Sequence, residues 1–480
     1  MAGASDAYEK NREMLTYRRT TAVLVAVLMA TAGCRGSAPE PTAIHILPSA
    51  TPKALPTQTA RPTHTATPLP TATATRTPTP TATPPTPTPI PPTATPLPAT
   101  HTVCASGCDF DTIQAAVDAT GRTGDAIIEV TDGIHAEAGI TVREGMTVTI
   151  RGLGTAATVV QAHETLETSP ERVFLIKEGA LVTLARMTIR HGRPEEDSCG
   201  GGILSEGTLS LEHVMVRDNR ANGGGGVCSR GGKASLSVIN STIDENTAGA
   251  TVGGSLACGN GGGIRTGSGK LSLINTTVTG NTTATGRGRG GGIHIGCGGT
   301  AAFTNTTISG NRASPQADNA VSRRQQGHGG GVNLHGTLRL VHCTISGNHA
   351  SGPGGGLFVR GHLDLVNTIV ADNSGQGGDC VLSGPDAYGI SGSLERTSYS
   401  LVSDGTCDPA ISGDPMLGPL AENGGNTLTQ ALLQDSPAID AVPAVSCTLP
   451  ADQRGALRPV VRTSAETPCD IGAYEVQAGP

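Results

Sequence analysis

Three polar residues, Arg265, His294 and Asn333, each follow a glycine triplet and one aliphatic residue in similar stretches of the sequence. The neighbouring stretches of this kind carry Leu204, Cys228 and Phe358 at the same place. If these stretches stack, the six residues form one outward row with a polar middle. Basic residues gather in the inserts beside it: Arg287 and Arg289 in TGRGRGGGI, and Arg323, Arg324 and His328 in VSRRQQGHGGGV.

Such a basic patch, on a chain with a net charge of -7, could bind an anionic glycan or polyuronate. The alternative is that these side chains only solvate exposed faces and loops, because single exposed charges need no function. A third interpretation is a polysaccharide lyase that uses Arg265 and His294, one to neutralise the sugar carboxylate and the other as the base.

Other catalytic chemistry has less support in the sequence. A glycoside hydrolase needs two carboxylates about 5–10 Å apart, but Asp218 and Glu245 are separated from Asp372 by repeats with glycine at that place. The predicted row offers no Asp or Glu to bind calcium, and aromatic residues are only 2% of the chain. We therefore expect a structural, adhesive or glycan-binding protein without metal or cofactor, with a polysaccharide lyase or glycoside hydrolase as the alternative.

The composition indicates a repetitive core. The 480 residues include no Trp but 67 Gly, and charged residues make up 15%. A core of small aliphatic side chains favours many similar layers. The mild net charge gives no indication of nucleic-acid binding.

Strand-like units recur, for example LSLINTTVTGN and LRLVHCTISGN. Each ends in an Asn, and these lie at positions 219, 246, 281, 311, 348 and 373. A unit of about 25 residues with irregular inserts is typical of a solenoid. The fold class that we predict is all-β: a right-handed parallel β-helix over residues 103–412, with a short N-terminal capping helix around Ile113 and a C-terminal cap.

Stacked coils would place equivalent residues in rows about 4.8 Å apart. We expect Leu271 and Leu273 to stack inward with the leucines of later repeats, Leu338, Leu340, Leu363 and Leu365. Asn240, Asn275, Asn305 and Asn367 should form a hydrogen-bonded ladder at a bend. The glycine triplets should lie where the backbone has positive φ or leaves no room for a Cβ.

The N-terminal part is predicted to lie outside this fold. Residues 1–34 contain a short apolar run after Arg18 and Arg19, as in a signal peptide. TAGC resembles a bacterial lipobox, which would make Cys34 a lipidated anchor in the membrane; simple secretion is the alternative. Residues 35–102 are rich in Thr and Pro, which predicts an extended stalk or a disordered linker.

The GGGI and N-x-T-I-x-G-N units resemble the β-helix repeats of the pectin-lyase-like superfamily, and more loosely those of polymorphic outer-membrane proteins. Residues 413–480, with GDPMLGPLAENGGNTLTQALLQDSPAID and CDIGAYE, resemble the choice-of-anchor Q domain of bacterial surface proteins. The resemblance implies an extracellular β-helix whose relatives attach to the cell envelope by differing means, of which a lipobox would be one. Together with the basic patch, this leads us to expect a membrane-anchored cell-surface protein, with an anionic glycan or another cell surface as partner. The resemblance implies no catalytic residues. We expect this domain to cover the C-terminal edge of the solenoid.

The cysteines fit an oxidising compartment. Their proximity in stacked coils predicts the disulfides Cys104–Cys108, Cys199–Cys228, Cys258–Cys297, Cys380–Cys407 and Cys447–Cys469, with Cys343 unpaired. Zinc binding is the alternative, but only Cys104 and Cys108 approach the spacing of a ligand pair.

Overall fold

The computed structural model describes residues 98–121, 125–194, 199–249, 260–284, 288–313, 326–385, 389–459 and 467–477. The predictions for residues 1–97, including Cys34, lie outside the described residues, as do those for Cys258, Arg287, Arg323 and Arg324. No helix within the described ranges is long and apolar enough to cross a membrane.

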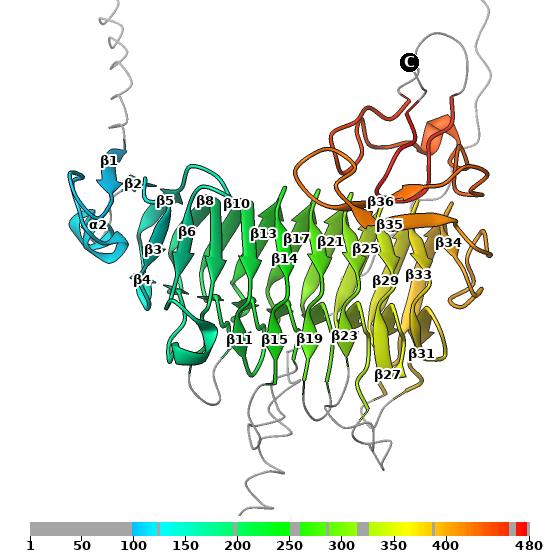
Figure 1. Ribbon diagram of the computed structural model, residues 1–480. Helices are drawn as coiled ribbons and strands as arrows, with labels where there is room; N and C mark the ends of the chain where they lie inside the picture. The colour runs from blue at the N-terminus through cyan, green and yellow to red at the C-terminus, as the bar shows by residue number, and fades with distance from the viewer. Residues whose placement is uncertain are drawn as a thin grey trace, which may run out of the picture. The chain divides into compact units, whose positions relative to one another are not determined.

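The described residues form a right-handed parallel β-helix in which three parallel sheets wind around one core (Figure 1). The largest sheet bends into two runs. The first run contains β1 (Ala99–Val103), β2 (Asp125–Val130), β5 (Thr147–Arg151), β8 (Leu181–Arg190), β10 (Thr208–Arg217), β13 (Ser235–Ile239), β17 (Lys270–Ile274), β21 (Thr300–Thr304), β25 (Thr337–Val341), β29 (His362–Val366) and β33 (Ser393–Ser398). The second run contains β3 (Ile134–Ala136), β6 (Val159–Gln161), the ends of β8 and β10, β14 (Thr242–Asp244), β18 (Thr277–Thr279), β22 (Thr307–Ser309), β26 (Thr344–Ser346), β30 (Ile369–Ala371) and β34 (Leu401–Val402).

Two further parallel sheets complete the coils, and the second of them begins only at β11 (Arg220–Ala221). One contains β4 (Ile140–Val142), β7 (Phe174–Ile176), β9 (Ile203–Ser205), β12 (Val227–Ser229), β16 (Ile264–Thr266), β20 (Ile293–Ile295), β24 (Val332–Leu334), β28 (Leu357–Val359) and β32 (Cys380–Leu382). The other contains β11, β15 (Thr247–Ala248), β19 (Thr282–Thr283), β23 (Arg312–Ala313), β27 (His349–Pro353) and β31 (Ser374–Gln376).

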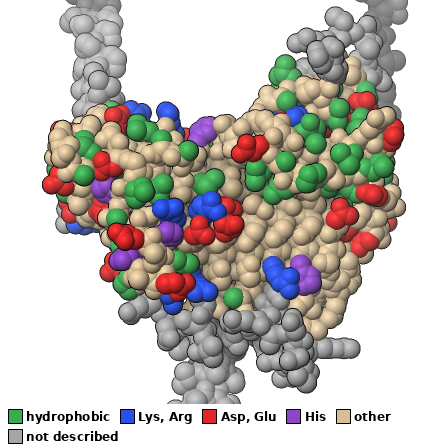
Figure 2. Space-filling model, in the orientation of Figure 1, with side chains coloured by type: hydrophobic (Ala, Val, Ile, Leu, Met, Phe, Trp, Pro, Cys, Tyr) green, Lys and Arg blue, Asp and Glu red, His purple; other side chains and the backbone are tan. Residues whose placement is uncertain are grey.

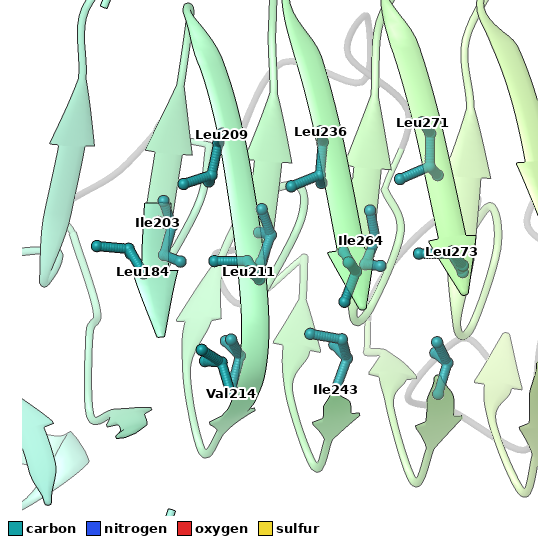
Figure 3. Packing of buried hydrophobic residues seen from close by; sticks show 14 of the residues in the cluster. Leu184, Ile203, Leu209, Leu211, Val214, Leu236, Ile243, Ile264, Leu271 and Leu273 are labelled. Carbon is teal, nitrogen blue, oxygen red and sulfur yellow. The ribbon is translucent and has the colours of Figure 1, made fainter. Parts of the chain in front are cut away.

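The core consists of aliphatic rows that run from coil to coil, as predicted. Leu273 aligns with Phe303 in the next coil, then with Leu340 and Leu365, and all four are fully buried. Figure 3 shows the same stacking for Leu209, Leu236 and Leu271. The period-two alternation therefore places every second side chain inside.

The glycine triplets bring neighbouring coils into close contact. Gly261, the first of its triplet, has a φ of +68°, and a Cβ on the second, Gly262, would lie 2.1 Å from the carbonyl oxygen of Gly291. Both expected reasons for glycine, positive φ and lack of space, are therefore confirmed.

The predicted asparagine ladder is present at the bend of the largest sheet. Asn275 Nδ2 donates to Asn240 Oδ1 at 3.1 Å, and Asn305 Nδ2 donates to Asn275 Oδ1 at 3.3 Å. Asn240, Asn275, Asn305 and Asn367 all have φ between 47° and 51°, in the left-handed region that Asn tolerates.

A second ladder was not predicted. The Asn residues that end each repeat are buried, except the half-buried Asn373, and each Oδ1 accepts a hydrogen bond from the preceding coil. Asn281 Oδ1 accepts from the backbone N–H and the Nδ2 of Asn246, and Asn281 Nδ2 donates to Asn311 Oδ1. Asp379 ends the ladder by accepting both bonds from Asn373.

The N-terminal end of the β-helix is covered by α2 (Ile113–Ala119), as predicted. Ile113, Ala116 and Val117 are buried in the main core. The Glu137 carboxylate accepts hydrogen bonds from the backbone N–H groups of Ile113 and Gln114, which fixes the start of the helix on the coils.

The position of the C-terminal segment, described for residues 413–459 and 467–477, differs from the predicted end cap. The segment lies along the side of the coils rather than over the last one (Figure 1, orange to red). Its strands β35 (Leu417–Ala421) and β36 (Thr429–Leu432) form an antiparallel pair. CDIGAYE is not a last strand; of its residues only Cys469 makes a bridge, to Val442.

The C-terminal segment lies along the side of the coils because of the side chains on the outward face of the second run. Its coils display rows of Thr and Ser, such as Thr277, Thr307 and Thr344, whose hydroxyl groups bond to the segment. On β30 the row becomes apolar, and Ile369 joins a small hydrophobic core with Leu432 and Ile471 of the segment. At the end of the solenoid, Ile411 instead pairs with Leu401.

Four of the predicted disulfides are present: Cys104–Cys108, Cys199–Cys228, Cys380–Cys407 and Cys447–Cys469. Cys343 is buried with a free thiol that takes the place of the Thr306 and Thr368 hydroxyls. Burial raises the pKa of the Cys343 thiol to about 12.

Candidate functional site

The predicted polar row exists, but it is not an open surface. Strand register aligns Cys228, Arg265, His294, Asn333 and Phe358 on β12, β16, β20, β24 and β28. Except for the half-buried Arg265, these residues are buried. The prediction of an accessible outer row is therefore wrong for His294 and Asn333, whose side chains lie beneath the surface.

His294 is held as a neutral group. Its Nδ1 lies 3.1 Å from Asn333 Oδ1, which can only accept, so the proton is on Nδ1. Burial lowers the pKa of His294 well below its usual value, and nearby His335, Arg289 and Arg265 add to the effect. The ring centroids of His294 and His335 are 5.5 Å apart.

The remaining predicted binding residues are only partly brought together. Arg265 directs Nη1 to the sulfurs of the Cys199–Cys228 disulfide, at 3.0 and 3.6 Å. Arg289 forms a parallel bridge with His328, whose ring lies 4.8 Å from that of Phe358. The disulfide and aromatic contacts give Arg265 and His328 a packing role.

The acidic residues form ion pairs rather than a catalytic dyad. Arg217 pairs with Asp218, Asp244 and Glu245. Burial raises the pKa of Asp244 to about 6, although Arg217 opposes the effect. In the described ranges, no group of three or more His, Cys, Asp or Glu residues is placed to hold a metal ion.

A groove that the sequence analysis did not predict lies on another side of the coils. Its floor comes from the bend of the largest sheet, at the positions that continue the asparagine ladder towards the N-terminus. Arg186, His213 and Asn240 hold these positions with φ of 57°, 54° and 49°. The groove has a volume of about 430 Å³ and is lined by Gly154, Thr155, Arg186, His213, Val214, Met215, Asn240, Thr242 and Asn426.

The two walls come from distant parts of the sequence. One wall is the loop at Gly154 and Thr155, and Arg186 Nη2 donates to Leu153 O of this loop at 3.1 Å. The other is Asn426 of the C-terminal segment, where the neighbouring Thr427 donates to Asn275 O. Figure 2 shows the surface hollowed beside the C-terminal segment, with basic and histidine side chains close by.

The groove floor follows the coil spacing. Arg186 and Asn240 are two coil steps apart, which is about 10 Å at the usual strand separation. That width accommodates a single extended polymer chain. The half-buried Met215 adds an apolar contact between the polar groups, whereas the Val214 side chain lies in the core.

The side chains of the lining offer more hydrogen-bond donors than acceptor atoms. The exposed Arg186 guanidinium makes no ion pair with a carboxylate in the described ranges, and none of the nine lining residues is Asp or Glu. Such a surface favours oxygen-rich and anionic ligands. It offers no pair of carboxylates for glycoside hydrolysis.

The sequence contains a signal for the floor of this groove. Arg186 in ARMTI and His213 in EHVMV align with Asn240 in INSTI, so they take the place of the ladder asparagine. The replacement of Asn by Arg and His in consecutive coils indicates where the bend stops carrying the asparagine ladder and directs longer side chains outward. The second wall has no local signal, because it depends on the docking of a distant segment.

No known protein family matches this chain, and no curated protein matches it either. Among solved structures, pectate lyase Pel9A matches with 13% identity over 76% of this chain and 91% of its own, with a TM-score of 0.44. The pectin methylesterase from carrot matches with 13% identity over 64% and 90%, at 0.36, and that from Aspergillus niger over 67% and 91%, at 0.31. The similarity concerns the fold alone.

Proposed function

We propose that this protein is a glycan-binding β-helix displayed on a bacterial cell surface, and that the groove at Arg186, His213 and Asn240 holds an acidic polysaccharide chain. The observation that carries the proposal is the Arg186 guanidinium, which lies on the floor of a donor-rich groove without a carboxylate partner in the described ranges. Lys and Arg side chains in such a cleft attract anionic ligands.

The N-terminal features fit display outside the cell. The apolar run before Cys34 and the Thr/Pro-rich residues that follow are those of a lipid-anchored protein with a spacer. Four disulfides in the described part fit an oxidising compartment. The anchor, the stalk and the likeness of residues 413–480 to a choice-of-anchor Q domain are parts of the same proposal.

Calorimetry with oligogalacturonate tests the proposal. We expect the wild-type chain to bind it and the Arg186→Ala variant to bind about 10- to 100-fold more weakly, because a hydrogen bond to a charged group contributes about 1.5–3 kcal/mol. The fully methyl-esterified oligomer has the same backbone without the charge and should bind as weakly as the free acid binds to the variant.

Arg396→Ala is the matched control, because Arg396 is exposed on β33 in the last coil, outside the groove. It should retain wild-type affinity. Equal binding of the acid and the ester, or no effect of Arg186→Ala, would overturn the proposal. Formation of unsaturated products, followed by their absorbance, would instead establish a polysaccharide lyase.

A further inference from the structure

The C-terminal segment shows which chemical group the bend ladder binds. The ladder continues beneath this segment from Asn275 to Asn367, and its side-chain amides donate to backbone carbonyl oxygens laid across them. Asn305 Nδ2 donates to Ala451 O at 2.9 Å, and Asn367 Nδ2 donates to Ser446 O at 2.9 Å.

The threonine hydroxyls of the second run, which lie beside the ladder, also bond to the C-terminal segment. Two residues after Asn275, Thr277 donates through Oγ1 to Leu428 O at 2.6 Å. In the coil of His342, Thr344 Oγ1 accepts from the backbone N–H of Ala473. A ladder amide and the threonine two residues later form a unit: in different coils the amide donates to a backbone C=O, and the hydroxyl donates to a C=O or accepts from an N–H.

Asn240 and Thr242 are the next unit in these two rows, and the segment ends short of them. Thr242 aligns with Thr277, and Asn240 Oδ1 accepts from Asn275 Nδ2. Asn240 Nδ2 also lies 3.5 Å from His213 Nε2, so the second N–H of this amide is the group available for a ligand. Both residues line the groove.

Resting on the proposed glycan-binding function, we infer that this part of the groove binds the acetamido group of an N-acetylated sugar, with Asn240 and Thr242 bonding to its amide. An acetamido group presents the same C=O and N–H as the backbone that covers the rest of the ladder.

A peptide is the other source of amide groups, and the floor of the groove disfavours it. β10 is paired with β8 on one edge and with β13 and β14 on the other, so it has no free edge for a peptide strand. The lining also has too few acceptors for the regularly repeated N–H groups of a peptide backbone.

Two neutral tetrasaccharides test the inference apart from charge. Chitotetraose and cellotetraose differ only in the acetamido group that replaces one hydroxyl on each sugar. We expect the full chain to bind chitotetraose about 5-fold more tightly, as one added hydrogen bond of about 1 kcal/mol would give.

Asn240→Gly keeps the left-handed backbone and removes the amide, and Thr242→Val keeps the shape and removes the hydroxyl. Each should abolish the preference for chitotetraose, whereas the control Arg396→Ala, outside the groove, should retain it. A retained preference in both variants, or equal wild-type affinity for the two tetrasaccharides, would overturn the inference while the proposed function stands. Tighter binding of the capped peptide acetyl-hexaalanine-amide, lost in Asn240→Gly, would assign the unit to peptides. If no saccharide binds, the proposed function fails as well.

Discussion

One backbone position explains both the ladder and the groove. At the bend, successive coils place a residue in the left-handed region, and Asn suits it because its short side chain bonds locally. Where Arg186 and His213 replace Asn, the same backbone geometry directs longer side chains outward. Ligand-binding chemistry can therefore appear on the solenoid without any change in how its coils stack.

His342 takes this position in a buried coil and should make the protein sensitive to acid. Asn367 Nδ2 donates to its Nε2 at 2.9 Å, and burial together with Arg458 lowers the pKa of His342 to about 2. The folded protein keeps this imidazole neutral, whereas the unfolded chain takes up a proton below a pKa of about 6.5. The free energy of unfolding should therefore fall as the pH falls below 6.5.

His342→Asn should remove this part of the pH dependence, since Asn holds the same position in the coils of Asn305 and Asn367. Between pH 7.5 and pH 5, the wild-type chain should lose about 2 kcal/mol more stability than the variant, at about 1.4 kcal/mol per pH unit below 6.5. Chemical unfolding at the two pH values measures the difference. The same loss in both proteins would contradict the buried neutral state of His342.

At the scale of one coil, two glycines in the same repeat have different reasons to be glycine. A Cβ on Gly262 would meet the Gly291 carbonyl oxygen of the next coil at 2.1 Å, whereas a Cβ on Gly280 would have its nearest neighbour at 3.5 Å. Gly280 has a φ of +63°, but Asp218, Glu245 and Asp372 adopt similar angles at the same place in other coils.

We expect Gly262→Ala to destabilise the protein by at least about 3 kcal/mol, because rigid backbone must move to admit the methyl group. The matched variant, Gly280→Asn, should cost less than about 1 kcal/mol, since Asn tolerates the left-handed region. Urea unfolding of both proteins tests the coil spacing. Similar stabilities for the two would show that the coils are not held as closely as the structure indicates.

The sequence predicts the elements well because the determinants of a coil lie within one repeat. Alternating leucines predict the inward rows, and the recurrence of Asn240, Asn275, Asn305 and Asn367 predicts the bend ladder. The buried state of His294 could not be predicted from its repeat alone, because burial depends on what lies over the strand. The internal ladder of Asn281 and its equivalents was missed, although the same recurrence marks it.

At the scale of the whole molecule, the C-terminal segment determines which part of the bend ladder stays open. It covers the ladder from Asn275 onward and leaves Arg186, His213 and Asn240 exposed or half-buried. Bonds such as Thr277 to Leu428 join residues 151 positions apart in the sequence. No pattern within a repeat encodes such a contact, so the groove wall at Asn426 could not be predicted from periodicity, although the floor at Arg186 and His213 could.

The open end of the bend ladder is the binding site that we propose. A crystal structure of the full chain with chitotetraose bound tests it most directly. We predict that the saccharide lies between the Gly154–Thr155 loop and Asn426, with an acetamido oxygen within hydrogen-bonding distance of Asn240 or Thr242. A saccharide bound over Arg265 and His294, with the groove empty, would contradict the account.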